Sequence, residues 1–405
     1  MLLFVMNFIS MKKICLLFLT LICFSLKAQL SFSDSIQVSL LTCSEGPDAY
    51  ERFGHSAVRI LDYKNPQDIV FHWGVFNFNA PNFVWRFVKG ETDYQLGATY
   101  TQYFIEEYSE RGLGMTEAVL NLNQDEAQKM IDVILENYKP ENRTYRYSFF
   151  FDNCATRPFN VINKATDNRI EYDTAWVEDI TLRDMLHEKT DICTWLQFGI
   201  SLAVANRADK QAYFTEQMFL PEYLEKAYLN ANLGDKPLVK EKKEILKMKP
   251  DVREEIDSFY SILFGPGVIL LIVYIAMIIL RYKSKKRPKL LTPLKTIDTI
   301  ILFGTGIAGI IIWFLNFFSE HPSVDNNVNC ILLLPTNVIF AVTIWIKSAE
   351  KVNRIYFWII FAAIGAYAII NLIFVHQYFY VCICFIILLY LEICRQILDK
   401  DEQEK

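Results

Sequence analysis

Three absences narrow the class of protein before any motif is considered. The 405-residue chain has no excess of positive charge, since its formal net charge is −5, and it has no basic patch interleaved with aromatic residues. We therefore do not expect nucleic acid as a partner. No pair of its 9 cysteines shows the spacing of metal ligands, which argues against a zinc site. We predict neither a metal nor a cofactor.

The third absence concerns the C-terminal part of the chain, where long apolar stretches carry almost no ionisable residues. A small-molecule transporter needs such residues along its pathway, so this class is disfavoured. The chain is 52% hydrophobic, which is high for a wholly soluble protein. The excess is uneven, because Leu30 to Asp257 has a mixed composition and the chain after Ile262 is mostly apolar. This pattern indicates a membrane enzyme or receptor.

Apolar stretches of roughly spanning length predict an all-α membrane domain at 261–395 with about five helices. They lie at Ile262–Leu280, Thr296–Phe318, Ile331–Ile346, Tyr356–Val375 and Tyr378–Ile393, and Pro335 interrupts the third. The strongest basic cluster runs from Arg281 to Lys289 and is expected on the cytoplasmic side. The domain before the first span then lies outside the cytoplasm, and 396–405 forms a cytoplasmic tail.

The N-terminus agrees with this topology. Lys12 and Lys13 precede the apolar run Ile14–Leu26, and Ala28 offers a cleavage site, which is the layout of a signal peptide at 1–28. An uncleaved anchor is the alternative. We expect an exported domain at 29–235, followed by a heavily charged solvated helix or linker at 236–260.

Within the exported domain, the residue pattern predicts an α+β fold. Alternating or apolar runs predict strands at Ile36–Thr42, His55–Leu61, Ile69–Phe78 and Arg143–Phe151. Helical spacing predicts a helix at Asn123–Tyr138 and an interrupted helical region from Gly199 to Tyr228.

The segment from Phe149 to Arg157 is the candidate catalytic stretch. Asp152 or Asn153 is expected to cap a helix that continues to Ala165, which places Cys154 at the helix N-terminus. There the helix dipole and free N–H groups favour the nucleophilic thiolate. A small buried core cysteine is the alternative.

Two histidines lie upstream on neighbouring predicted strands, His55 and His72. A Cys–His hydrolase or acyltransferase needs an imidazole within reach of the thiol and a polar group that orients it. The order of histidine strands first and an Asn-Cys helix last resembles the permuted papain-like group that includes the lecithin:retinol acyltransferase type. Either histidine can instead be a satisfied core residue. Cys43 and Cys193 are the other exported cysteines, and a disulfide between them would leave Cys154 free.

Several further segments resemble the Lnb-type lipoprotein N-acyltransferases. They are Phe53–Arg59, Pro81–Phe83, Pro140–Arg143, Asp152–Arg157 and Met218–Pro221 in the exported domain, and Glu320–Pro322 and Pro335–Asn337 in the membrane domain. The resemblance implies transfer of a fatty acyl group from a phospholipid to the α-amine of the lipid-modified N-terminal cysteine of a lipoprotein. It also implies a multi-pass protein of the inner membrane with a periplasmic catalytic domain.

In this interpretation, Cys154 forms a thioester, His55 moves the proton, His72 orients His55, and N–H groups near Asn153 and Ala155 stabilise the oxyanion. Asn153, Arg157 and His321 are candidate substrate contacts. Arg157 can instead pair with Asp152, and His321 can be an ordinary interfacial residue.

Three other functions remain open from the sequence. A phospholipase would use water in place of the amine, and a cell-wall amidase or peptidase of the same fold would have no need of the spans. A non-catalytic binding or sensor module would have no reason to hold Cys154 and His55 in this order.

Overall fold

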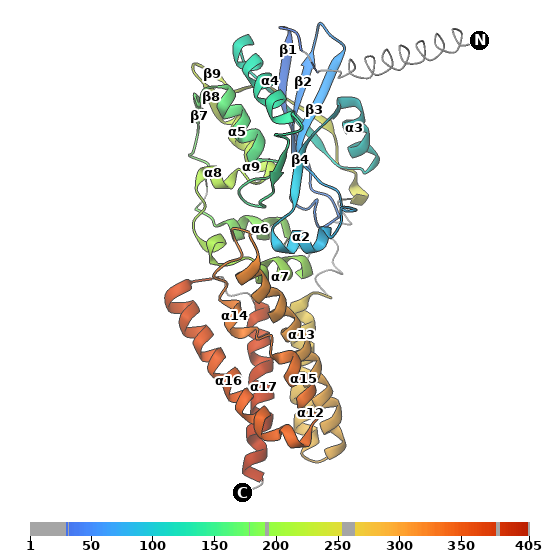
Figure 1. The fold of residues 1–405 in the computed structure, drawn as a ribbon, viewed down its shortest axis with the longest axis vertical. Coiled ribbons are helices and arrows are strands. Elements are labelled where there is room, and N and C mark those ends of the chain that lie inside the picture. Colours follow the sequence, from blue (N-terminus) through green and yellow to red (C-terminus); the bar gives the residue numbers. More distant parts are fainter. Residues whose placement is uncertain are drawn as a thin grey trace, which may run out of the picture.

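The structure is a computed structural model that describes residues 30, 32–177, 179–190, 194–252, 264–377 and 381–403. The predicted signal peptide at 1–28 and Cys193 lie outside these residues. A domain of strands and helices stands on a long helical domain (Figure 1). The expected combination of an α+β domain with a helical domain is therefore confirmed.

A seven-stranded sheet forms the centre of the upper domain, and all of its neighbouring strands are antiparallel. The strand order is β10-β5-β1-β2-β3-β4-β6. The strands are β1 (Ile36–Cys43), β2 (His55–Asp62), β3 (Gln67–Val75), β4 (Asp93–Tyr100), β5 (Met115–Leu120), β6 (Thr144–Arg146) and β10 (Val239–Leu246). A small second sheet contains β7 (Ile170–Tyr172), β8 (Ala231–Leu233) and β9 (Lys236–Pro237).

The helices of this domain cover the sheet and its lower end. They are α2 (Phe83–Lys89), α3 (Thr101–Glu110), α4 (Gln124–Tyr138), α5 (Thr156–Ala165), α6 (Leu182–Thr190), α7 (Thr194–Ala203), α8 (Phe214–Gln217) and α9 (Pro221–Leu229), with a 3₁₀ turn at Asn206–Asp209. The predicted helix at Asn123–Tyr138 is confirmed, because Asn123 and Glu126 form a reciprocal capping box at its start.

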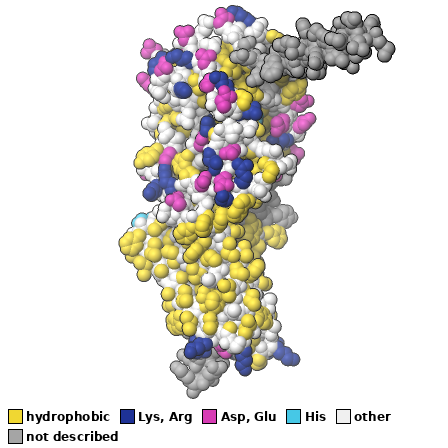
Figure 2. Space-filling view, viewed as in Figure 1, with side chains coloured by type: hydrophobic (Ala, Val, Ile, Leu, Met, Phe, Trp, Pro, Cys, Tyr) yellow, Lys and Arg dark blue, Asp and Glu magenta, His cyan; other side chains and the backbone are white. Residues whose placement is uncertain are grey.

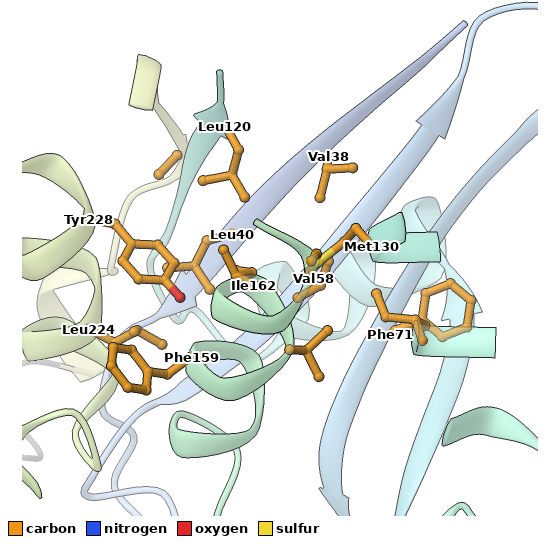
Figure 3. Packing of buried hydrophobic residues seen from close by; sticks show 14 of the residues in the cluster. Val38, Leu40, Val58, Phe71, Leu120, Met130, Phe159, Ile162, Leu224 and Tyr228 are labelled. Carbon is orange, nitrogen blue, oxygen red and sulfur yellow. The ribbon is translucent and has the colours of Figure 1, made fainter. Parts of the chain in front are cut away.

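Period-2 alternation divides the strand side chains between two buried faces. One face carries Val38, Leu40 and Val58 and packs against α4, α5 and α9, through residues that include Met130 and Ile162 (Figure 3). The other face carries Leu41, Cys43, Ala57 and Val70, which pack with Phe104 of α3. The candidate site lies at the end of the sheet where β2 begins and β3 ends.

One expectation for the exported domain is wrong, and another is confirmed. The strand predicted at Arg143–Phe151 is limited to β6, and its aromatic end forms a turn with an isolated bridge between Ser148 and Asp152. These rings pack beside α6 and Phe219 instead of entering a sheet. The helical region from Gly199 to Tyr228 is broken into α7, the 3₁₀ turn, α8 and α9, as the interruption in the pattern indicated.

The charged stretch at 236–260 is neither a helix nor a linker at its beginning. Val239–Leu246 forms β10, the edge strand that pairs with β5. Its lysines and glutamates lie largely exposed, and Lys242 Nζ lies 2.9 Å from Glu225 Oε2. Charged side chains protect an open sheet edge from pairing with other chains. Because most side chains of β10 are charged, its sequence shows no apolar alternation that would predict a strand.

The lower domain contains mainly long apolar helices. It consists of α12 (Pro266–Ser284), α13 (Leu291–Phe318), α14 (Asn329–Leu332), α15 (Asn337–Thr343), α16 (Glu350–Ile369) and α17 (Val381–Gln403), with short 3₁₀ turns at Pro288–Leu290 and Lys347–Ala349 and a π-helical end at Ile370–Val375. In the described part of the chain, three helical segments are long and apolar enough to cross a membrane, namely Pro266–Ser284, Pro288–Phe318 and Lys347–Val375.

The third predicted span is split into α14 and α15 at Pro335, as its interruption indicated. The last helix extends to Gln403, beyond the predicted end of the membrane domain at 395. The surface of the lower domain is almost continuously hydrophobic, and charged side chains gather over the upper domain and at the far lower end (Figure 2).

Candidate active site

The two candidate histidines lie on one face of adjacent strands. His55 begins β2, and His72 of β3 pairs directly with Ala57, so alternation places His55, Ala57 and His72 on the same side. His55 Nε2 lies 3.2 Å from His72 Nδ1. Their rings meet edge to face, with centroids 5.4 Å apart. The predicted approach of the two histidines is thus present in the structure.

Cys154 and His55 both lie beside Gly74 of β3. The pairing of β2 with β3 ends at Ala57 and His72, and the β3–β4 register shifts between His72 and Val75. Gly74, within this bulge, has a φ of +97°. A Cβ at Gly74 would lie 3.7 Å from Cys154 Cβ and 3.8 Å from His55 Cε1. Cys154 and His55 therefore both lie within van der Waals distance of the position that a side chain at residue 74 would occupy.

The sequence analysis did not identify Gly74 as part of the site. Its signal was available, because a single glycine inside a strand pattern often marks a bulge or a close approach of another chain segment. Only the structure shows that the approaching segment carries Cys154.

Asn153 holds the backbone around Cys154 from both sides. Its Oδ1 accepts hydrogen bonds from the N–H groups of Ala155 (2.8 Å) and Thr156 (3.0 Å). Its Nδ2 donates to the carbonyls of Phe149 (2.8 Å) and Phe219 (2.9 Å). The side chain is buried and both of its polar atoms are engaged. This geometry gives Asn153 a positioning role and leaves it no donor or acceptor for substrate.

The resting site is electrically neutral. Burial raises the pKa of the Cys154 thiol to about 11, and the N–H groups of Ser56 and Cys154, which point at the sulfur, lower it only in part. Burial and the neighbouring His72 lower the pKa of His55 to about 3, and burial lowers the pKa of His72 to about 4. The expected helix-stabilised thiolate is therefore wrong for the resting state, because desolvation outweighs the helix N-terminus.

Two of the N–H groups near the nucleophile are engaged within the turn. The Ala155 N–H is bonded to Asn153 Oδ1, and the Asn153 N–H donates to Thr156 Oγ1 at 2.8 Å. The Cys154 N–H lies between them in the chain, and the backbone of Cys154 and Ser56 partly offsets the raised pKa of the thiol.

The two remaining candidates, Arg157 and His321, make structural contacts. Arg157 forms a two-point ion pair with Asp152, with Nη2 2.6 Å from Oδ2, and its guanidinium lies 4.0 Å from the centre of the Tyr145 ring. His321 Nε2 lies 2.7 Å from the carbonyl oxygen of Phe87, away from the histidine pair. His321 therefore joins the loop after α13 to α2.

Cys43 lies on β1 directly opposite His55 and is a buried free thiol. Cys193, its possible disulfide partner, lies outside the described residues. Within the described residues, no group of three or more His, Cys, Asp or Glu side chains is placed to hold a metal ion.

Two family models match this chain, and together they account for both domains. The model of the Lnb N-terminal periplasmic domain matches residues 28–188, and the model of the Lnb transmembrane domain matches residues 258–402. The chain belongs to the Lnb family. Neither a search of curated proteins nor a search of solved structures gave a match.

The two matches identify one part of the chain as a periplasmic domain and the other as a transmembrane domain. The periplasmic-domain match contains His55, His72 and Cys154, and the transmembrane-domain match contains His321. The protein is thus a membrane-anchored member of a lipoprotein-related family, with an exported α+β domain and a helical membrane domain.

Proposed function

We propose that the protein is a lipoprotein N-acyltransferase that uses Cys154 as its nucleophile. The observation that carries this proposal is the space at Gly74, where Cys154 and the His55–His72 pair approach each other. The proposed acyl donor is a membrane phospholipid and the proposed acceptor is the N-terminal diacylglyceryl-cysteine of a lipoprotein, as the resemblance to the Lnb-type lipoprotein N-acyltransferases implies; the lipoprotein-related Lnb family supports this choice.

One tautomer of the histidine pair suits the proposed reaction. If the proton of His55 lies on Nε2, it is donated to His72 Nδ1 across 3.2 Å, and His55 Nδ1 is left free to act as a base. The lowered pKa values of both rings keep them neutral at physiological pH. His55 is then ready to accept the thiol proton, and His72 acts as the positioning residue.

The first half-reaction forms a thioester. The Cys154 thiol gives its proton to His55 as the sulfur attacks the ester carbonyl of the phospholipid. The N–H of Cys154 stabilises the oxyanion. When the carbon–oxygen bond breaks, the proton passes from His55 to the leaving alkoxide, which departs as a lysophospholipid.

The second half-reaction forms the amide. The α-amine of the lipoprotein cysteine attacks the thioester carbonyl, and His55 accepts the amine proton. The carbon–sulfur bond then breaks and the proton returns to the sulfur, which regenerates the thiol. Cys154 is half-buried, and an acyl chain bound over it would exclude water and favour the amine over hydrolysis.

The test is the N-terminal mass of a lipoprotein in cells that depend on the wild-type protein or on Cys154→Ala. We expect wild type to add one acyl group to the lipopeptide and Cys154→Ala to lose more than about 10³-fold of this activity. Cys43→Ala is the matched control, because it removes a buried free thiol on the adjacent strand and should retain activity.

Other outcomes would contradict the proposal. Full activity of Cys154→Ala would make the thiol structural. An unchanged lipopeptide mass, with release of free fatty acid and lysophospholipid by wild type, would instead identify a phospholipase.

A further inference from the structure

Helix α2 lies at the boundary between the two domains and is bound directly to the end of α13. Ser319 Oγ donates to the carbonyl of Val88 at 2.8 Å, and the Glu320 N–H donates to the carbonyl of Lys89 at 2.8 Å. The ring of Trp85 contacts that of Phe314 in α13, with centroids 5.0 Å apart. Because α13 is a membrane-spanning candidate, these contacts fix the height of α2 relative to the bilayer.

The end of α13 marks the edge of the membrane. Phe317 and Phe318 close the helix and are exposed, and the polar residues Ser319 and Glu320 follow at once. Trp195 of α7 donates to the carbonyl of Phe264, just before α12, and both of these residues are also exposed. Exposed aromatic residues at helix ends are typical of the membrane–water interface.

Helix α2 of the upper domain carries further exposed apolar and aromatic side chains next to the end of α13. Its side chains Val84 and Trp85 are 73% and 55% exposed, and none of its residues is buried. Figure 2 shows that hydrophobic surface extends from the helical domain up to the base of the charged upper domain. A short helix with large exposed apolar side chains at this height fits the boundary between headgroups and acyl chains.

A row of aromatic rings connects α2 with the catalytic cysteine. Phe87 and Phe83 of α2 lie 6.3 Å apart, Phe83 stacks on Phe76 at 5.6 Å, Phe76 lies 4.9 Å from Tyr94, and Tyr94 stacks on Tyr147 at 4.2 Å. The row ends at Tyr147, next to Ser148, and the isolated bridge between Ser148 and Asp152 folds this segment back toward Cys154. Phe76 follows the Gly74 bulge by two residues.

We propose that α2 docks into the outer surface of the bilayer and that a phospholipid acyl chain enters along the row Phe87–Phe83–Phe76–Tyr94–Tyr147 toward Cys154. This inference rests on the proposed function, because it assigns the entry route of the acyl donor. The apolar rings suit an acyl chain, and the continuity of α2 with the surface of α13 identifies the bilayer as the occupant of the exposed face.

The docking is tested with the full chain in vesicles of phosphatidylethanolamine and phosphatidylglycerol. The photocrosslinker benzoylphenylalanine is placed at Val84, or at Tyr63 as the control. Tyr63 is 64% exposed and follows β2 at the end opposite His55. We expect a phospholipid adduct at position 84 and none at position 63. Absence of the adduct at position 84 would overturn the docking.

The entry route is tested by the acylation of Cys154 with two donors, vesicle phospholipid and a water-soluble short-chain thioester. We expect Val84→Asp to slow acylation from vesicles about five- to tenfold and to leave the soluble donor unaffected. Tyr63→Asp should change neither rate. Equal rates for Val84→Asp and wild type with vesicles would overturn the entry route.

The two donors also separate this inference from the proposed function. If wild-type Cys154 is acylated by neither donor, the acyltransferase proposal fails, and the entry route fails with it. If the soluble donor acylates every variant and Val84→Asp matches wild type in vesicles, the entry route alone is wrong.

Discussion

At the scale of single residues, the neutral Cys154–His55 pair predicts an unusual pH dependence of thiol reactivity. The raised pKa of Cys154, at about 11, means that the thiolate fraction keeps increasing from pH 6 to pH 10. The lowered pKa values of the histidines prevent an imidazolium from stabilising the thiolate near neutral pH. Alkylation of Cys154 by iodoacetamide, followed by peptide mass spectrometry, should therefore accelerate about tenfold per pH unit across this range.

The shape of the plot of alkylation rate against pH decides this prediction. A plateau of fast alkylation between pH 5 and pH 8 would indicate a preformed thiolate–imidazolium pair and would contradict the neutral resting state. His55→Ala should leave the slope unchanged, because in the resting site the thiol is not ionised by that ring.

Gly74 provides a second prediction at this scale. In Gly74→Ala, the added methyl group comes into van der Waals contact with Cys154 and His55, and the φ of +97° becomes strained by roughly 1–3 kcal/mol, which shifts the backbone beside both residues. We expect the rate of Cys154 acylation by a soluble thioester donor to fall at least about tenfold.

Gly234→Ala is the matched control for the strain of Gly74→Ala. Gly234 also has a positive φ, at +62°, but nothing lies within 4 Å of the position of its added Cβ. Both variants should lower the melting temperature, and only Gly74→Ala should lose activity. Equal activity of the two variants would show that the gap at Gly74 has no catalytic importance.

At the scale of elements, the sequence was informative where local pattern determines structure. Alternation predicted β1 and β2, and the cap at Asn123 predicted the start of α4. The histidine strands and the helix that follows Cys154 therefore appeared in the correct order. The 3.2 Å contact between His55 and His72 also follows from pairing two adjacent strands, which a hairpin enforces.

The elements that the sequence did not reveal depend on distant partners. β10 joins the sheet through β5, more than a hundred residues earlier in the chain, and its charged side chains carry no apolar alternation. Helix α2 has only seven residues, and it is positioned by the end of α13. The neutral state of the thiol likewise depends on burial by several elements, so a local reading of the helix N-terminus predicted the wrong sign of the pKa shift.

At the scale of the whole molecule, the last turn of α7 is held by both domains. From the catalytic domain, buried Arg183 donates to the carbonyls of Ser201 (3.0 Å) and Val204 (2.8 Å). From the helical domain, Asn327 Nδ2 donates to the carbonyls of Leu202 (2.7 Å) and Ala203 (3.1 Å). This turn therefore fixes the catalytic domain on the membrane domain.

Asn327→Ala should loosen that connection. The change removes a buried donor from two carbonyls of α7, and it removes the acceptor of the Asn329 N–H and of Gln377 Nε2. The expected cost is about 1–3 kcal/mol for each buried polar group left without a partner. Hydrogen exchange of the full chain in vesicles should therefore accelerate at 202–205, while the amides of β2 and β3 in the sheet keep their protection.

Asp325→Ala is the control, because Asp325 is exposed and accepts a hydrogen bond from its exposed neighbour Asn326. If Asn327 fixes the height of the active site above the bilayer, its variant should also lose acylation of Cys154 from vesicle phospholipid more than from a soluble donor. Equal loss with both donors would place the effect of Asn327 on the catalytic site itself, and unchanged exchange at 202–205 would show that α7 is held without it.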